Sequence, residues 1–284
     1  MSEPITQGQI DIRARYFYLG CVLIFAIRFA SSCLFSQLSQ PVLIYPDVDN
    51  TYWLFHWLGI PYLTTHSVIW SAVLDILLFL IPIIASLVSG RRLFALLFTL
   101  LAVIYQITFS TYSKHQYHSL IGVLVLSIPF WTGPGRRFTF LWEAARYYLF
   151  FIFSSAALWK LSRGAVLDSG HMSSVFMAQH VQTIYEYPSS VFTHLHSYLI
   201  SHAGLARLIF LTGFTLQLSF LGGFFTKRYD RIYLVLFIAF FAMNYLVMQI
   251  FDLEIFIFLL VLLDWDKIEK KIKNPIPATE PYTS

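Results

Sequence analysis

The sequence predicts an all-α integral membrane protein in which eight transmembrane helices form one bundle. Hydrophobic residues make up 57% of the 284 positions, aromatic residues 18% and charged residues only 12%, which is more apolar surface than one soluble core can bury. The apolar residues fall into windows of about 20 residues, the length that crosses a hydrocarbon core of about 30 Å. Lysine and arginine gather at every second boundary between these windows, as they do in cytoplasmic loops.

The first window contains FASSC, which loosely resembles a lipoprotein cleavage site, so this window could be a signal peptide. Because Arg28 interrupts its apolar run, we expect instead that the window stays in the protein as a helix. Six windows have full membrane length. They are residues 16–35, 67–88, 93–112, 142–161, 205–225 and 232–247. Two windows are shorter, residues 116–131 before TGPGRR and residues 250–265 before DKIEKK.

The windows at residues 232–247 and 250–265 could be read as one long helix, because no Gly or Pro interrupts residues 232–265. A single crossing would place the KIEKKIK segment on the outside, against the charge rule. We therefore expect two helices that turn near residues 249–252.

The basic residues orient the chain. They are Arg13 and Arg15, Arg91 and Arg92, Arg136 and Arg137, Lys227, Arg228 and Arg231, and the lysines of residues 267–273. We expect both termini in the cytoplasm of a bacterial inner-membrane protein. Residues 1–15 would form a cytoplasmic segment, residues 16–265 the transmembrane domain, and residues 266–284 a basic and then Pro-rich cytoplasmic tail.

The long loops, residues 37–66 and 162–206, both fall on the expected outer side. Within the second loop, Phe192, Leu195, Leu199 and Ile200 form the stripe of an amphipathic helix over residues 190–203. This extracytoplasmic helix would lie on the outer membrane surface or cap the bundle.

All nine histidines also fall on the expected outer side. Amphipathic rings collect at membrane interfaces, but a group that titrates near neutrality could also serve chemistry there. No HExxH motif and no Cys/His ligand spacing is present, so we expect no metal site.

Two charges lie deeper in the apolar windows. Arg28 is about seven residues from the outer end of its window and Asp75 about eight from the outer end of its own, a depth of roughly 10–12 Å at 1.5 Å per residue. Because intramembrane charges usually pair, the matched depth predicts an Arg28–Asp75 structural ion pair.

Lys160 ends the apolar run YYLFFIFSSAALWK. Its amine could extend to the lipid headgroups. It could also turn inward beside His118, which lies one turn inside the outer boundary if the fourth helix begins near His115. A desolvated amine at the edge of an apolar cavity can act as a base near neutral pH.

The segments YSKHQYHSLIGVLVLSIPFW and SSAALWKLSRGAVLDSG resemble the paired signature of the horizontally transferred transmembrane domain family, the membrane module of vitamin K-dependent gamma-carboxylase. FAIRFASSCL resembles the first helix of that family and FDLEIFIFLLVLLDW its closing helix. The resemblance covers nearly the whole chain.

This resemblance implies an eight-helix bundle whose active site opens to the extracytoplasmic side. It implies that Lys160 is the catalytic base toward an isoprenoid quinol and that His118 helps to hold it, with His115 as the alternative. Where members often place a histidine in the penultimate helix, FFAMNY offers Phe241 or Asn244, and Asn244 is our candidate binding residue. The large soluble domain that recruits protein substrates in the carboxylase is absent from these residues.

Two functions follow as hypotheses. The first is a membrane-embedded enzyme that acts on a quinol at the outer leaflet. The second is a non-catalytic membrane subunit that binds a lipid or quinone and docks a partner membrane-protein complex. The net charge of +4 is explained by the basic cytoplasmic loops, so nothing indicates a nucleic-acid partner.

Overall fold

The computed structural model describes residues 5–38, 50–89, 91–112, 120–249 and 253–273. Within these ranges every regular element is a helix, and an isolated β-bridge joins Ile5 to Gly135. The α-helices and 3-10 helices (η) are α1 (Gln7–Ala30), η1 (Phe35–Gln37), α2 (Asn50–Trp57), α3 (Ile60–Thr65), α4 (Val68–Leu87), α5 (Arg92–Tyr112), α6 (Ile121–Ser127), η2 (Ile128–Trp131), α7 (Arg136–Ser162), α8 (His171–Glu186), α9 (Val191–Ser201), α10 (Ala203–Ser219), η3 (Phe220–Phe224), α11 (Asp230–Met248), η4 (Leu253–Leu262) and α12 (Trp265–Lys273).

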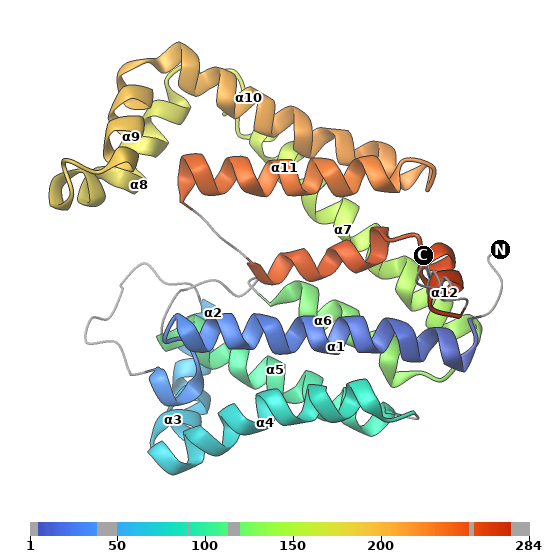
Figure 1. Ribbon diagram of the computed structural model, residues 1–284. Helices are drawn as coiled ribbons and strands as arrows, with labels where there is room; N and C mark the ends of the chain where they lie inside the picture. The colour runs from blue at the N-terminus through green and yellow to red at the C-terminus, as the bar shows by residue number, and fades with distance from the viewer. Residues whose placement is uncertain (1–4, 39–49, 90, 113–119, 250–252, 274–284) are drawn as a thin grey trace, which may run out of the picture. The chain divides into compact units, whose positions relative to one another are not determined.

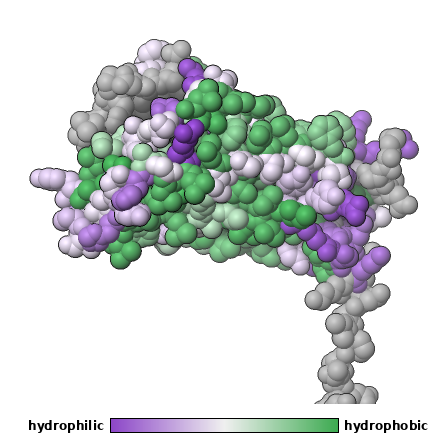
Figure 2. All heavy atoms as spheres, turned by 90° about the horizontal axis from the view of Figure 1, so that it is seen from above, coloured by the Kyte–Doolittle hydropathy of each residue, from purple (hydrophilic) through white to green (hydrophobic). Residues whose placement is uncertain are grey.

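Five helical segments of the described chain are long and apolar enough to cross a membrane. They are Gln7–Gln37, Val68–Leu87, Arg92–Tyr112, Ala203–Phe224 and Asp230–Met248. Each coincides with a full-length window of the sequence, and the shorter apolar helix Ile121–Trp131 falls in a compressed window. Five of the expected spans are thus present as membrane-length helices, while the count of eight remains a prediction. The face of the molecule drawn in Figure 2 is mostly hydrophobic, and its hydrophilic residues gather toward the helix ends.

The chain divides into two compact units: unit 1 comprises Met1–Ala145 and Asp252–Ser284, and unit 2 comprises Arg146–Phe251. In unit 1, α1 packs along α4, and α4 packs along α5 (Figure 1). The core between these helices is aromatic. Phe17, Phe98 and Phe130 are buried, with ring centroids 6.4 Å apart for Phe17 and Phe98 and 5.3 Å apart for Phe17 and Phe130.

The closing segment η4 is a 3-10 helix of ten residues. At about 2.0 Å of rise per residue it extends about 20 Å, further than an α-helix of the same length. The segment is therefore longer than its residue count suggests for an α-helix. It packs against α6 at Gly122, where an added Cβ would lie 2.7 Å from Ile257 Cγ2 and 3.2 Å from the backbone oxygen of Glu254.

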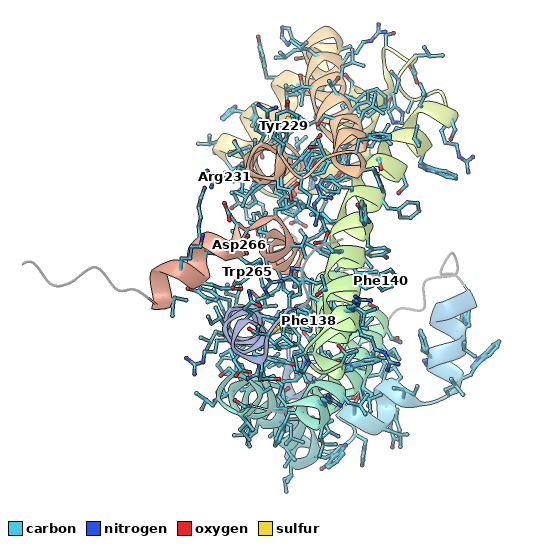
Figure 3. The ribbon with its side chains drawn as sticks, turned by 90° about the vertical axis from the view of Figure 1, so that its right-hand side faces the viewer. Phe138, Phe140, Tyr229, Arg231, Trp265 and Asp266 are labelled. Carbon is cyan, nitrogen blue, oxygen red and sulfur yellow. The ribbon has the colours of Figure 1, made fainter. Side chains whose placement is uncertain are left out.

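The basic end of unit 1 is fixed by Arg13. Its guanidinium lies 3.5 Å from the carboxylate of Glu269 and faces the rings of Trp142 and Trp265, with centroids 5.4 and 5.2 Å away. Trp265, labelled in Figure 3, also donates from Nε1 to the backbone oxygen of Leu260 at 2.8 Å. These contacts attach α12 to α1 and to the start of α7.

In unit 2, α10 and α11 run side by side, and α8 and α9 form a hairpin at one end of them (Figure 1). The long-helix alternative for residues 232–265 is wrong, because α11 ends at Met248 with Gln249 in the left-handed region at φ 52°. The turn itself lies partly outside the described residues.

The expected helix over residues 190–203 is present as α9, and Ser190 caps it by accepting from the backbone N–H of Thr193 at 3.0 Å. Its buried face differs from the expected stripe. Thr193, His196 and Leu199 are buried, whereas Leu195 is 37% exposed. The reason is that α9 packs on α8 through its histidine side, which rotates the apolar stripe partly outward.

Replacing Gly122 with valine should destabilise the protein by about 1–3 kcal/mol, because the added side chain forces η4 away from α6. Thermal unfolding of the purified protein in detergent measures the change. Gly8→Ala is the matched control, since nothing lies within 4 Å of the added Cβ there. Equal melting temperatures for the two variants would contradict the close packing.

Candidate functional site

The position of Lys160 is set by the end of α7. Gly164 has a φ of +72°, and its N–H donates to the oxygen of Leu161 at 3.0 Å. The N–H of Ala165 donates to the oxygen of Lys160 at 3.1 Å. This pair of bonds is a Schellman C-cap, for which a glycine in the left-handed region is the favoured residue. The KLSRG sequence therefore ends the helix one turn after the lysine.

Lys160 lines a cavity of about 190 Å³ inside unit 2. Helices α8, α10 and α11 supply the remaining wall, which is mainly apolar. The apolar lining residues are Met172, Val175, Ile209, Phe210, Gly213, Phe240, Met243, Val247 and Met248. Three of the five methionines of the chain are among them, and flexible methionine side chains suit a cavity that adapts to its ligand.

The amine of Lys160 has a neutral partner. Its Nζ donates to Oε1 of Gln217 at 2.7 Å and lies 5.7 Å from the centroid of the Phe210 ring. Among the described residues it forms no salt bridge with a carboxylate. The amine is thus held by an amide and an aromatic ring at the edge of an apolar space.

Asn244 lines the same cavity from α11. Phe241, the other residue that FFAMNY offered for this place, is buried in an aromatic cluster with Phe153 and Phe237, with ring centroids 6.0 and 4.8 Å from its own. The structure therefore brings together two of the candidate site residues, Lys160 and Asn244. His118 and His115 lie outside the described residues, so their place beside Lys160 stays a prediction.

Two further polar residues of this site were missed by the sequence analysis. Gln217 is 7% exposed, and the signal for it was a single glutamine in the apolar run FTLQLSF. His171 lines the cavity with its ring centroid 5.6 Å from that of Phe210. It was only one of nine histidines, and nothing in its neighbours indicated that it would face Lys160's cavity.

The expected Arg28–Asp75 ion pair is wrong. Arg28 instead forms a salt bridge with Glu254 of η4, and its Nη1 donates to the hydroxyl of Tyr105 at 2.9 Å. The guanidinium also lies 4.0 Å from the centroid of the Phe109 ring. These buried contacts link α1, α5 and η4 within unit 1.

Asp75 has a different role. Its two carboxylate oxygens accept from the backbone N–H groups of Phe35 and Ser36 at 2.9 and 3.0 Å. These are the first free donors of η1, so the carboxylate caps a short helix that follows the end of α1. Depth along the helices predicted Asp75 as the partner of Arg28, and the packing of α1 against η4 gave Arg28 the carboxylate of Glu254 instead.

No group of three or more His, Cys, Asp or Glu side chains placed to hold a metal ion occurs among the described residues. No protein-family model matches the chain, and no curated protein and no solved structure matches it either. The function is therefore argued from the cavity and its residues.

Replacing Glu254 with glutamine should destabilise the protein by about 3–5 kcal/mol, because it removes the negative charge of Glu254 from its salt bridge with the buried Arg28 guanidinium. Unfolding in detergent at several temperatures measures the loss. The Arg28→Met/Glu254→Leu double variant should recover much of the stability, since apolar side chains then replace both charges of this pair. A double variant less stable than Glu254→Gln would argue against this account of the pair.

Proposed function

We propose that this chain is a membrane protein whose unit 2 cavity binds the head group of an isoprenoid quinol, with Lys160 as the base that receives a proton from it. The observation that carries the proposal is the hydrogen bond between Lys160 and Gln217 at the edge of an apolar cavity. A carboxylate partner would hold the lysine as an ammonium. An amide oxygen accepts equally well from an amine that must lose and regain a proton.

The size of the cavity supports a small ring as the ligand. A protein cavity of about 150 Å³ accommodates benzene, so about 190 Å³ accommodates one six-membered ring with small substituents. Phe210 offers a face on which such a ring can stack.

The polar groups of the cavity fit a hydroxylated ring. The amine of Lys160 would take the proton of one ring hydroxyl, and the amide of Asn244 would donate to a second ring oxygen. Burial of the ring among apolar side chains excludes water from that proton transfer. The resemblance to the carboxylase module, read from the sequence, gives Lys160 the same role.

The second candidate is a non-catalytic membrane subunit that binds a lipid or quinone in this cavity and docks a partner complex. It is favoured by the fact that Lys160 already has a good hydrogen-bond acceptor and an aromatic neighbour, so the lysine can anchor α7 to α10 without any reaction. Lys160→Arg separates the two candidates, because a guanidinium can anchor but does not lose its proton at ordinary pH.

We further propose that the cavity faces the extracytoplasmic side of a bacterial inner membrane and that both termini are cytoplasmic. The alternation of basic loops supports this orientation. A lysine at the outer end of α7 would then meet a quinol that enters from the outer leaflet.

In a Cys33→Ser background, Tyr185→Cys should react with a membrane-impermeant maleimide in intact cells, because residue 185 is 87% exposed and lies on the proposed outer side. Arg92→Cys, also at an exposed position, should react only after the cells are permeabilised. The remaining cysteine, Cys21, is buried and should not react with the maleimide. Labelling of residue 92 in intact cells would contradict the proposed orientation.

Gly213→Leu should weaken the binding of a short-chain benzoquinol by about tenfold or more, because the new side chain occupies the cavity beside Met243. Binding to the protein in nanodiscs can be followed by quenching of intrinsic tryptophan fluorescence. Gly204→Ala is the control, since nothing lies within 4 Å of its added Cβ. Unchanged binding by Gly213→Leu would show that the quinol does not bind in this cavity.

Lys160→Arg should keep the fold and the bound quinol while slowing the oxidation of the quinol by added dioxygen, which gives quinone and hydrogen peroxide, by about 10²–10⁴-fold, the usual contribution of a general base. The ultraviolet absorbance change between quinol and quinone in reconstituted vesicles measures the rate. Arg163→Lys, which changes a basic residue stacked on Trp159, is the matched control. If the wild-type protein binds the quinol but neither protein oxidises it, the docking subunit is the better description.

A further inference from the structure

Two histidines of the α8–α9 hairpin form a buried stack. The rings of His180 and His196 have centroids 3.7 Å apart and planes within 4° of parallel. The two residues are 3% and 0% exposed, and the rings of Phe176 and Phe192 lie about them. Neither helix belongs to the five membrane-length segments.

The hairpin is attached to the end of α11 by two hydrogen bonds. Nε2 of His196 bonds to the oxygen of Val247 at 2.9 Å, and Nε2 of Gln179 donates to the oxygen of Met248 at 2.8 Å. The last carbonyls of an α-helix lack partners within the helix. The hairpin supplies donors to the carbonyls of Val247 and Met248, and both of these residues also line the cavity.

These bonds fix the protonation state of His196. A carbonyl oxygen can only accept, so Nε2 of His196 carries the proton and the neutral ring has a bare Nδ1. That Nδ1 is buried without a hydrogen-bond partner, and so is Nε2 of His180. A second proton on either ring would therefore place a charge in an apolar contact against the face of the other ring.

We propose that the α8–α9 hairpin is a lid on the cavity, which stays closed while His180 and His196 are neutral and opens when they take up protons. Helix α8 forms one wall of the cavity through His171, Met172 and Val175, so release of the hairpin from α11 opens that wall. Such a lid would control access to the cavity whatever ligand the cavity takes.

The surrounding charges do not offset a proton on the pair. On α8, Glu186 accepts from Gln182 on the exposed side, and His171 lies on the cavity wall. On α9, His194 is exposed. On α10, Arg207 is basic and cannot offset a positive charge on the pair. The group of α11 that bonds to the pair is the carbonyl of Val247.

The direction of the pH effect follows from burial. Burial lowers the pKa of both histidines below the ordinary value of 6.5, a charge on His196 lowers that of His180 further, and the Val247 carbonyl opposes these effects only in part. A histidine whose pKa is lowered in the closed form stabilises that form fully above about pH 6.5. The stabilisation is lost as the pH falls below this value, because the open form then binds more protons.

Distances between spin labels on the hairpin and on α11 test the lid. In the Cys33→Ser background, labels at Tyr185→Cys of α8 and Ile238→Cys of α11 both occupy exposed positions within unit 2. Pulsed electron paramagnetic resonance on the protein in nanodiscs, frozen from about pH 8 and about pH 5, gives the fraction of molecules in the longer-distance form. We expect this fraction to rise at least about fivefold on acidification.

The His180→Phe/His196→Gln variant should stay closed at both pH values, because phenylalanine keeps the stack and glutamine keeps a donor for Val247. His194→Gln, an exposed histidine on the same helix, should respond as the wild type does. If the double variant does not fold, His180→Phe alone should show at most half of the wild-type response. A wild type with no pH response, or variants of the stacked pair that respond as the wild type does, would overturn the proposal.

Discussion

Polar groups buried between apolar helices must find their partners within the protein, because lipid offers neither donors nor acceptors. This constraint accounts for several buried polar contacts in both units. In unit 1 it joins Arg28 to Glu254 and Tyr105, and it directs the carboxylate of Asp75 to two backbone N–H groups. Each of these contacts connects segments that are far apart in the chain, so the pairs also select how the helices lie against one another.

The same constraint operates in unit 2. Arg146 of α7 donates from Nε to Asp230 of α11 at 2.9 Å and from Nη2 to the oxygen of Thr226 at 2.8 Å. Near the C-terminal end of α7, Lys160 donates to Gln217 of α10. Helix α7 is therefore joined to α11 by a charged pair and to α10 by a hydrogen bond between a lysine and a neutral amide. The partner of Lys160 is thus a neutral amide, whereas the partner of Arg146 is a carboxylate.

The cavity and the hairpin depend on each other. Helix α11 ends at Met248, and its last carbonyls accept hydrogen bonds from side chains of α8 and α9 instead of from a further turn of helix. The residues around that end, Asn244, Val247 and Met248, line the cavity. Helix α8 of the hairpin also contributes His171, Met172 and Val175 to the wall of the cavity, so the hairpin and the cavity share residues.

The sequence by itself determined the helical class and the positions of five membrane-length helices, because apolar length and basic flanks are local properties that need no knowledge of the fold. It also located the end of α7 at Ser162 to within one residue, because the apolar window ends at residue 161, and the structure adds that Gly164 caps the helix in the left-handed conformation.

Only the tertiary structure decided which polar groups would meet. The matched depth of Arg28 and Asp75 predicted a pair, but the contact of α1 with η4 selected Glu254 for Arg28. The sequence identified Lys160 and Asn244 as candidates but not Gln217 or the stacking of His180 on His196. Hydropathy gives the depth of a residue along its helix, whereas its partner depends on the rotation of each helix, which is set by packing against all of its neighbours.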